Sequence, residues 1–108
     1  MKPTIAEIIM ATAREFGVGQ FDITGFSRDR RFTLPRFAVY AIAHDAGFSY
    51  PRIARSIGDR DKTSVISGKL RAAEFAATDP GFAASYAKLR HELLGADNPV
   101  QFKSSRVA

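Results

Sequence analysis

Apolar residues recur at helical spacing along most of the chain, and no stretch alternates like a β-strand for long enough to build a sheet. The first such pattern predicts a helix over 4–16. Thr4 and Glu7 match the reciprocal capping pattern of a helix start, and Gly17 ends the helix. Its inward stripe is expected to consist of Ile5, Ile8, Ile9 and Phe16.

The next segments are shorter and more polar. Residues 20–26 predict a helical turn or short helix that packs Phe21, Ile23 and Phe26 into the core. Residues 27–33 are basic and carry no apolar period, which predicts a loop. A helix over about 34–46 should follow, with Thr33 as its cap and Pro35 in its first turn.

The second half predicts three more helices. A short helix follows Ser49, and Gly58 stops it. Asp59 and Arg60 form a turn, and Asp61 can cap a helix over about 62–76. One face of this helix carries Ile66, Lys69, Leu70 and Ala73, and the other carries Ser64, Ser67, Gly68 and Arg71. The last helix, about 80–94, starts from Asp79 and Pro80 and presents Phe82, Tyr86, Leu89 and Leu93 inward.

These elements predict an all-α protein, a five- or six-helix bundle that contains a helix-turn-helix. With 108 residues, the chain is long enough for one hydrophobic core. We expect the domain to cover residues 1–95. Residues 96–108 are polar and contain Pro99 and a serine pair, which predicts a flexible C-terminal tail.

Positive charge is concentrated in the middle of the chain. The span from Arg28 to Arg71 holds ten basic and four acidic residues, whereas the rest holds six basic and seven acidic ones. The whole excess behind the net charge of +5 therefore lies in this span. A focused basic region attracts polyanions such as nucleic acid, and a solvated basic surface is the alternative that charge alone leaves open.

Several function classes find no support in the residues. The chain has no cysteine, which removes disulfides and thiolate chemistry, and it has no apolar run long enough to span a membrane. His44 and His91 are isolated, and no nucleophile motif surrounds the serines. We therefore expect a cytoplasmic protein that is not an enzyme, with no metal, no cofactor, no small-molecule substrate and no membrane partner.

The most informative stretch is the helix, turn and helix between Ser49 and Arg71. In a helix-turn-helix, the amino end of the second helix enters the major groove and meets base edges. Here that end carries Lys62, Thr63 and Ser64, which can donate to guanine, bond to bases or touch a thymine methyl. Asp61 can cap the helix or accept from a cytosine amino group. An ordinary helical hairpin that touches no DNA is the alternative.

Two strings within this stretch resemble a known family. Gly58-Asp59-Arg60-Asp61-Lys62-Thr63-Ser64-Val65 is similar to Gly-Gly-Arg-Asp-His-Thr-Thr-Val, a signature of the C-terminal DNA-binding domain of the bacterial replication initiator DnaA. Phe48-Ser49-Tyr50-Pro51-Arg52-Ile53-Ala54 resembles that family's Leu-Ser-Tyr-Pro-Glu-Ile-Gly. Arg30 to Arg36 resembles its basic loop and the Pro-Arg of the next helix, and a weaker similarity extends over about 4–94.

The resemblance implies roles by position. Arg30 or Arg31 would enter the minor groove, and Arg36 would lie near phosphate or a base edge. Asp61, Lys62, Thr63 and Ser64 would contact bases in the major groove, and Ser67 and Arg71 would add groove and backbone contacts.

Three positions depart from the family pattern. Lys62 replaces a histidine, Ser67 stands where another histidine is common, and Asp59 replaces a glycine. The preferred DNA site is therefore expected to differ from that of the family. The sequence also has no P-loop, so we expect a stand-alone domain without the ATPase function of the initiator.

Together these observations predict sequence-specific binding of double-stranded DNA at sites like the replication-initiator box, which would modulate replication initiation or transcription. The predicted base contacts are Arg30, Asp61, Lys62, Thr63, Ser64 and Ser67. The predicted backbone contacts are Arg28, Arg31, Arg36, Ser49, Tyr50, Arg52, Arg55, Arg60 and Arg71. We expect a nucleoid-associated protein whose further partners are the initiator or its regulators; its oligomeric state stays open. The alternative is an adaptor that binds the initiator or another factor without reading DNA.

Overall fold

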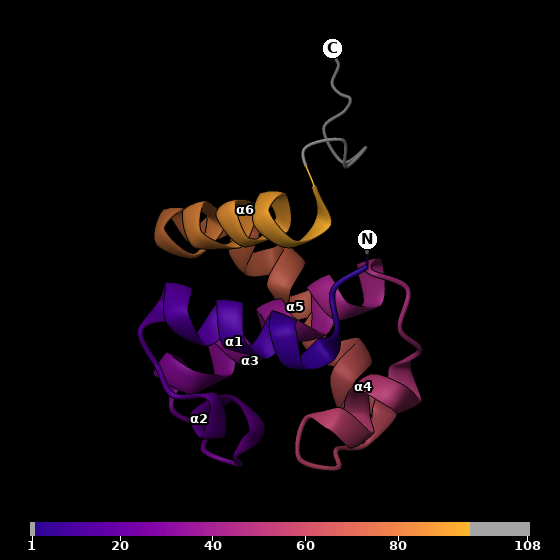
Figure 1. Cartoon of the computed structure of the whole chain (residues 1–108). Coiled ribbons are helices and arrows are strands. Elements are labelled where there is room, and N and C mark those ends of the chain that lie inside the picture. Colours follow the sequence, from indigo (N-terminus) through magenta and orange to yellow (C-terminus); the bar gives the residue numbers. More distant parts are fainter. Residues whose placement is uncertain (1, 96–108) are drawn as a thin grey trace.

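The computed structural model describes residues 2–95, and these residues form six helices and no strand (Figure 1). The helices are α1 (Ile5–Phe16), α2 (Gln20–Thr24), α3 (Arg30–Asp45), α4 (Tyr50–Ser56), α5 (Lys62–Thr78) and α6 (Pro80–Leu94). The predicted all-α fold with a helix-turn-helix is confirmed. The predicted tail, 96–108, lies outside the described residues. None of the six helices is long and apolar enough to cross a membrane.

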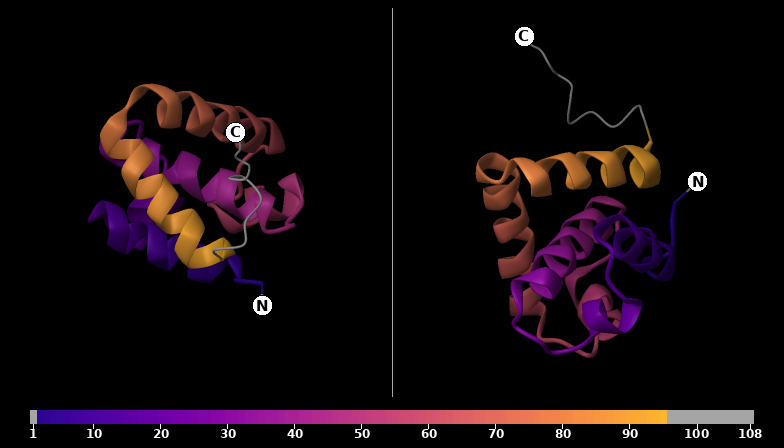
Figure 2. Two further views of the ribbon diagram at one scale, coloured as in Figure 1. Left: turned by 90° about the horizontal axis from the view of Figure 1, so that it is seen from above. Right: turned by 90° about the vertical axis from the view of Figure 1, so that its left-hand side faces the viewer.

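Helix α3 is the centre of the fold and contacts all five other helices. Helix α6 lies across one end of the molecule, and α5 runs from α6 toward the opposite end, where the α4–α5 turn lies (Figure 1, Figure 2). Large apolar side chains from several helices meet in the interior. Those with almost no exposed surface include Ile8, Ile23, Ile42, Ile53, Ile57 and Leu89. Burial of such side chains is the main stabilising contribution in a fold of this size.

Most helix starts lie where the capping residues predict them. The Thr4 hydroxyl accepts from the amide of Glu7 at 3.1 Å, and the Glu7 carboxylate accepts from the amide of Thr4 at 2.8 Å. Asp79 accepts from the amide of Phe82 at 3.1 Å at the start of α6. These side chains satisfy amide groups that have no partner within the helix.

The start of α3 differs from the prediction. The helix begins at Arg30 rather than near Leu34, and its cap is Asp29, whose carboxylate accepts from the amide of Arg31 at 2.9 Å. The stretch expected to be a loop therefore contributes a full turn of helix. Pro35 lies inside the helix instead of in its first turn.

The aromatic residues around α2 also differ from the prediction. Only Ile23 enters the core, whereas Phe21 is 90% exposed and Phe26 is 74% exposed. Phe21 precedes Ile23 by two residues in α2 and so lies on a different face of the helix, and Phe26 lies beyond the end of the helix. Two phenylalanines therefore lie on the surface.

The buried face of α5 is the third difference. Val65, Gly68 and Ala72 are buried, whereas Ile66 and Leu70, from the more apolar of the two predicted faces, are 36% and 61% exposed. The reason is the close approach of α3 to α5. A Cβ atom built at Gly68 would lie 2.3 Å from Cδ2 of Tyr40, so only a glycine lets the two helices pack this closely.

Candidate nucleic-acid interface

The amino end of α5 lies toward the end of the molecule opposite α6 (Figure 1). Lys62, Thr63 and Ser64 are all exposed there. The Asp61 carboxylate caps the helix by accepting from the amide of Thr63 at 3.3 Å. The first turn of α5 therefore presents a cationic side chain and two hydroxyls to solvent, in addition to the positive end of the helix dipole.

The outward face of α5 continues this surface for two more turns. Ser67 lies one turn beyond Thr63 and Ser64 and is exposed, as is Arg71 a further turn along. Arg71 forms an exposed ion pair with Glu74 at 3.4 Å. Because both partners are exposed, this pair is weak and leaves Arg71 available to another anion.

Helix α4 and the turn that follows it hold α5 in place. Ser49 caps α4 by accepting from the amide of Arg52 at 3.3 Å, and Ile53, Ala54 and Ile57 are buried against the core. The amide of Arg60 donates to the carbonyl of Ala54 at 2.7 Å and closes the turn. These contacts give the α4–turn–α5 unit the arrangement of a helix-turn-helix.

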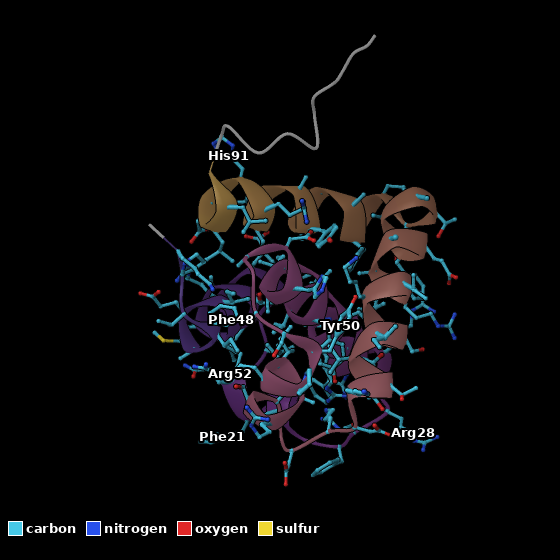
Figure 3. The ribbon with its side chains drawn as sticks, turned by 90° about the vertical axis from the view of Figure 1, so that its right-hand side faces the viewer. Phe21, Arg28, Phe48, Tyr50, Arg52 and His91 are labelled. Atoms are coloured by element: carbon cyan, nitrogen blue, oxygen red, sulfur yellow. The ribbon has the colours of Figure 1, made fainter. Side chains whose placement is uncertain are left out.

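Three exposed arginines flank this unit without an ion pair among the described residues: Arg28, Arg52 and Arg55. Figure 3 places Arg28 near the lower end of α5 and Arg52 on the side of α4 away from α5. The guanidinium of Arg52 lies 5.6 Å from the centre of the Phe48 ring. The two arginines therefore lie on opposite sides of the helix-turn-helix.

Arg30 and Arg31, the expected minor-groove residues, lie elsewhere. The Arg30 guanidinium stacks on Phe75 at 4.8 Å and lies 3.9 Å from the Asp79 carboxylate, so it is at the carboxyl end of α5. Arg31 pairs with Asp29 at 2.9 Å, and their hydrogen bond lowers the pKa of Asp29 below its usual value. The structure does not bring these two arginines to the Lys62 end.

Arg36, expected near phosphate or a base edge, is buried and faces the interior. Its side chain is 6% exposed, and its guanidinium donates to the carbonyls of Ile23 at 2.7 Å, Ser27 at 3.0 Å and Asp22 at 2.9 Å. Burial, and then the charge of Arg60, lower the pKa of Arg36. Arg36 therefore shapes the segment between α2 and α3 from inside the molecule.

Arg60, expected as a backbone contact, is half-buried. Its guanidinium donates to the carbonyl of Thr24 at 3.4 Å and to that of Gly25, and it lies 4.6 Å from the centre of the Phe26 ring. Arg60 ties the helix-turn-helix turn to the α2–α3 segment instead of reaching outward.

Tyr50 opens α4 and is half-buried, because its ring stacks on His44 with the centroids 4.1 Å apart. Among the described residues, no group of three histidines or carboxylates could hold a metal ion.

Of the predicted site residues, the structure brings together Lys62, Thr63, Ser64, Ser67 and Asp61 on α5 and its cap. Arg28 lies nearby. Sequence patterns missed the exposed Ile66 and Leu70 on the same helix, and the exposed Phe26 beside the turn.

Comparison with known proteins agrees with the helix-turn-helix arrangement of α4 and α5. The family model of the bacterial DnaA protein helix-turn-helix matches residues 5–70. The chromosomal replication initiator protein DnaA of Lacticaseibacillus casei is 31% identical over 91 residues, which cover 83% of this chain and 20% of that relative. The Thermus thermophilus protein is 34% identical over 74 residues, 68% of this chain and 17% of the relative. The DnaA protein of Ruegeria pomeroyi is 33% identical over 93 residues, which cover 85% of this chain and 20% of that relative.

The chain thus spans about a fifth of the length of the curated relatives that it matches. The matched family is a non-catalytic helix-turn-helix, and it supports DNA binding. Its match covers α1 to α4 and the first half of α5, which includes the exposed amino end of that helix. The protein belongs to the family of bacterial DnaA helix-turn-helix domains.

Proposed function

We propose that this protein binds double-stranded DNA in a sequence-specific way and that the amino end of α5 enters the major groove. The observation that supports this most is the exposure of Lys62, Thr63 and Ser64 on a helix end that its neighbours hold in place. Side chains at this end of a second helix are the ones that meet base edges in helix-turn-helix proteins. No covering element from the described residues stands in the way.

In this proposal, the side chains of α5 supply the specificity. Lys62 donates to the O6 and N7 atoms of a guanine, and the methyl group of Thr63 contacts a thymine methyl. Ser64 and Ser67 donate to base or phosphate oxygens. Asp61 caps the helix through one oxygen atom, and its exposed carboxylate can also accept from a cytosine amino group.

Exposed arginines supply affinity and register through phosphate contacts. We assign this role to Arg55, Arg52 and Arg71, with the Ser49 hydroxyl at the start of α4. Arg28 takes the minor-groove position in place of Arg30, because Arg28 lies at the Lys62 end and Arg30 contacts Phe75. Arg31, which pairs with Asp29, and Tyr50, which stacks on His44, contribute less.

The family relationship suggests the kind of site and process. We propose sites that resemble the box of the replication initiator, and a role in the modulation of replication initiation or of transcription. Lys62 and Ser67 stand where the family commonly has histidines, so the preferred sequence should differ at the bases that they read. Such a protein would act in the cytoplasm on the nucleoid. The helix-turn-helix family favours DNA reading over the adaptor alternative.

Selection of bound duplexes from a random pool tests the proposal. The wild-type protein should enrich one defined sequence. Lys62→Ala should lower affinity for that sequence by about 1–3 kcal/mol and flatten the preference at one base position. Lys88→Ala is the matched control, because Lys88 lies on α6 and pairs with Glu15 at 3.3 Å. It should keep both the affinity and the preference.

Two outcomes would contradict the proposal. Enrichment of no sequence would remove sequence-specific binding. An unchanged preference in Lys62→Ala would remove Lys62 from base reading. The affinity of the wild-type protein should also fall steeply with salt, since phosphate contacts release counterions. An adaptor without DNA affinity would show none of these effects.

A further inference from the structure

The segment between α2 and α3 is held by two arginines that donate to its backbone carbonyls. Arg36 donates to the carbonyls of Asp22, Ile23 and Ser27 at 2.7–3.0 Å. Arg60 donates to those of Thr24 and Gly25. The segment is therefore fixed to both α3 and the helix-turn-helix turn. Its carbonyls face these arginines, and the side chains of Phe26 and Arg28 are exposed.

Phe26 lies on the surface beside the turn of the helix-turn-helix. Its ring is 74% exposed, and the Arg60 guanidinium lies 4.6 Å from the ring centre. The ring also approaches Gly58, where a built Cβ atom would lie 3.8 Å from its Cζ atom. A single exposed phenylalanine alone indicates nothing about function. This one lies beside the Arg60 guanidinium, next to the turn, and it precedes Arg28 by two residues in the chain.

We propose that Phe26 is an apolar wedge that enters the minor groove next to the major groove read by α5. This inference rests on the proposed DNA binding. Minor-groove proteins insert side chains such as phenylalanine between base steps and kink the duplex by roughly 20–90°. The ring lies beside the Arg60 guanidinium, on a segment whose carbonyls accept from Arg36 and Arg60, so the backbone that presents it is ordered before DNA binds. Arg28, two residues further, enters the same groove.

The wedge would add specificity at a base step that α5 does not touch. Unstacking is easiest at pyrimidine–purine steps such as TA and CA. We therefore expect the selected duplexes to carry such a step on the side of the site where Arg28 lies. This preference comes from the deformability of the DNA and not from hydrogen bonds to base edges.

The test measures bending and unstacking on the selected duplex. End-to-end energy transfer reports the bend, and 2-aminopurine placed at the flanking step reports unstacking by its fluorescence. The wild-type protein should bend the duplex and raise the fluorescence. Phe26→Ala should lose both signals and bind about tenfold more weakly, whereas Phe26→Leu should keep most of both, because leucine is also an effective wedge.

Phe21→Ala is the matched control. Phe21 is 90% exposed, and Figure 3 places it on the other side of the lower end of the molecule from Arg28. This variant should behave like the wild type. Circular dichroism of each variant shows whether it keeps the helical fold.

The possible outcomes separate the two proposals. If Phe26→Ala is folded, binds the same site and still bends it, the wedge is overturned while DNA binding stands. A loss of the signals in Phe21→Ala as well as in Phe26→Ala would also overturn it. If the wild-type protein binds no duplex, both proposals fail.

Discussion

At the scale of single residues, Gly68 controls how closely α5 approaches α3. A built Cβ atom there would lie 2.3 Å from Cδ2 and 2.7 Å from Cε2 of Tyr40, and 3.0 Å from Cδ1 of Phe37. Tyr40 is buried, so its ring has little room to move. The glycine therefore determines the position of the helix that carries Lys62.

We predict that Gly68→Ala lowers the free energy of unfolding by about 1–3 kcal/mol, because the added methyl group overpacks the α3–α5 contact. Helix propensity alone would favour alanine by about 1 kcal/mol, so the loss measures the steric effect. Urea unfolding followed by circular dichroism gives the value. Gly81→Ala in α6 is the control, since its Cβ atom would approach only Asp79 Oδ1, at 3.5 Å. Equal stability of the two variants would contradict the packing argument.

Arg36 is the second residue with a structural role. We predict that Arg36→Met lowers the free energy of unfolding by about 2–4 kcal/mol, because three carbonyls lose a charged hydrogen-bond donor. Arg55→Met, at an exposed position, should change it by less than about 0.5 kcal/mol. It should instead make the salt dependence of DNA binding shallower by about one unit. Chemical denaturation and binding at several salt concentrations measure both effects, and the reverse pattern would contradict these assignments.

Residue type alone could not show that Arg36 is buried and Arg55 is exposed. Both occur in the basic middle of the chain, and a buried arginine is rare. The burial of Arg36 depends on carbonyls of residues 22–27, which only the folded chain brings to it. Lys62 was easier to predict, because its exposure follows from the position of the cap at Asp61.

At the scale of helices and turns, the capping residues were the sequence feature that best predicted where helices begin. Thr4, Ser49, Asp61 and Asp79 precede clear helices, and each begins one in the structure. Asp29 was missed because charged residues without an apolar period follow it. A helix start with no buried stripe resembles a loop in sequence, and only contacts with the rest of the fold identify it.

The inward face of α5 was missed for a different reason. Hydrophobicity favoured Ile66 and Leu70, but the residues that pack against α3 are the smaller Val65, Gly68 and Ala72. Close helix packing needs small side chains, which contribute weakly to a hydrophobic pattern. The larger apolar side chains are instead exposed on the face that continues from Thr63.

The turn between α4 and α5 contains a strained residue. Asp59 has a φ of +59°, in the left-handed region that favours glycine, and the family signature has a glycine at this position. The chain therefore carries an acidic side chain in an unfavourable backbone conformation, next to the proposed phosphate contacts.

We predict that Asp59→Gly raises the free energy of unfolding by about 0.5–1 kcal/mol, because relief of the backbone strain exceeds the entropy that glycine loses. It should also strengthen DNA binding at low salt, since a negative charge near the phosphates is removed. Asp59→Asn separates the two effects, because it removes the charge and keeps a side chain. Thermal unfolding and binding isotherms measure them. Weaker binding of both variants would contradict a phosphate-facing turn.

At the scale of the whole molecule, basic residues are paired with acids at one end and lack ion pairs at the other, among the described residues. Around α1 and α6, basic residues pair with acids, as in Arg14–Glu92 at 2.7 Å, Lys88–Glu15 at 3.3 Å and Arg90–Asp45 at 2.6 Å. At the opposite end, Arg28, Arg55 and Lys62 form no ion pair among the described residues. These unpaired cations favour an approach of DNA toward the helix-turn-helix.

The central claim, that the amino end of α5 and its neighbours meet DNA, can be tested at every residue at once. Amide shifts of isotope-labelled protein are followed by nuclear magnetic resonance during titration with the selected duplex. We predict that the largest changes occur in residues 25–29 and 61–71, and that α6 changes little. Largest changes along α1 and α6, with residues 61–67 unaffected, would contradict the account.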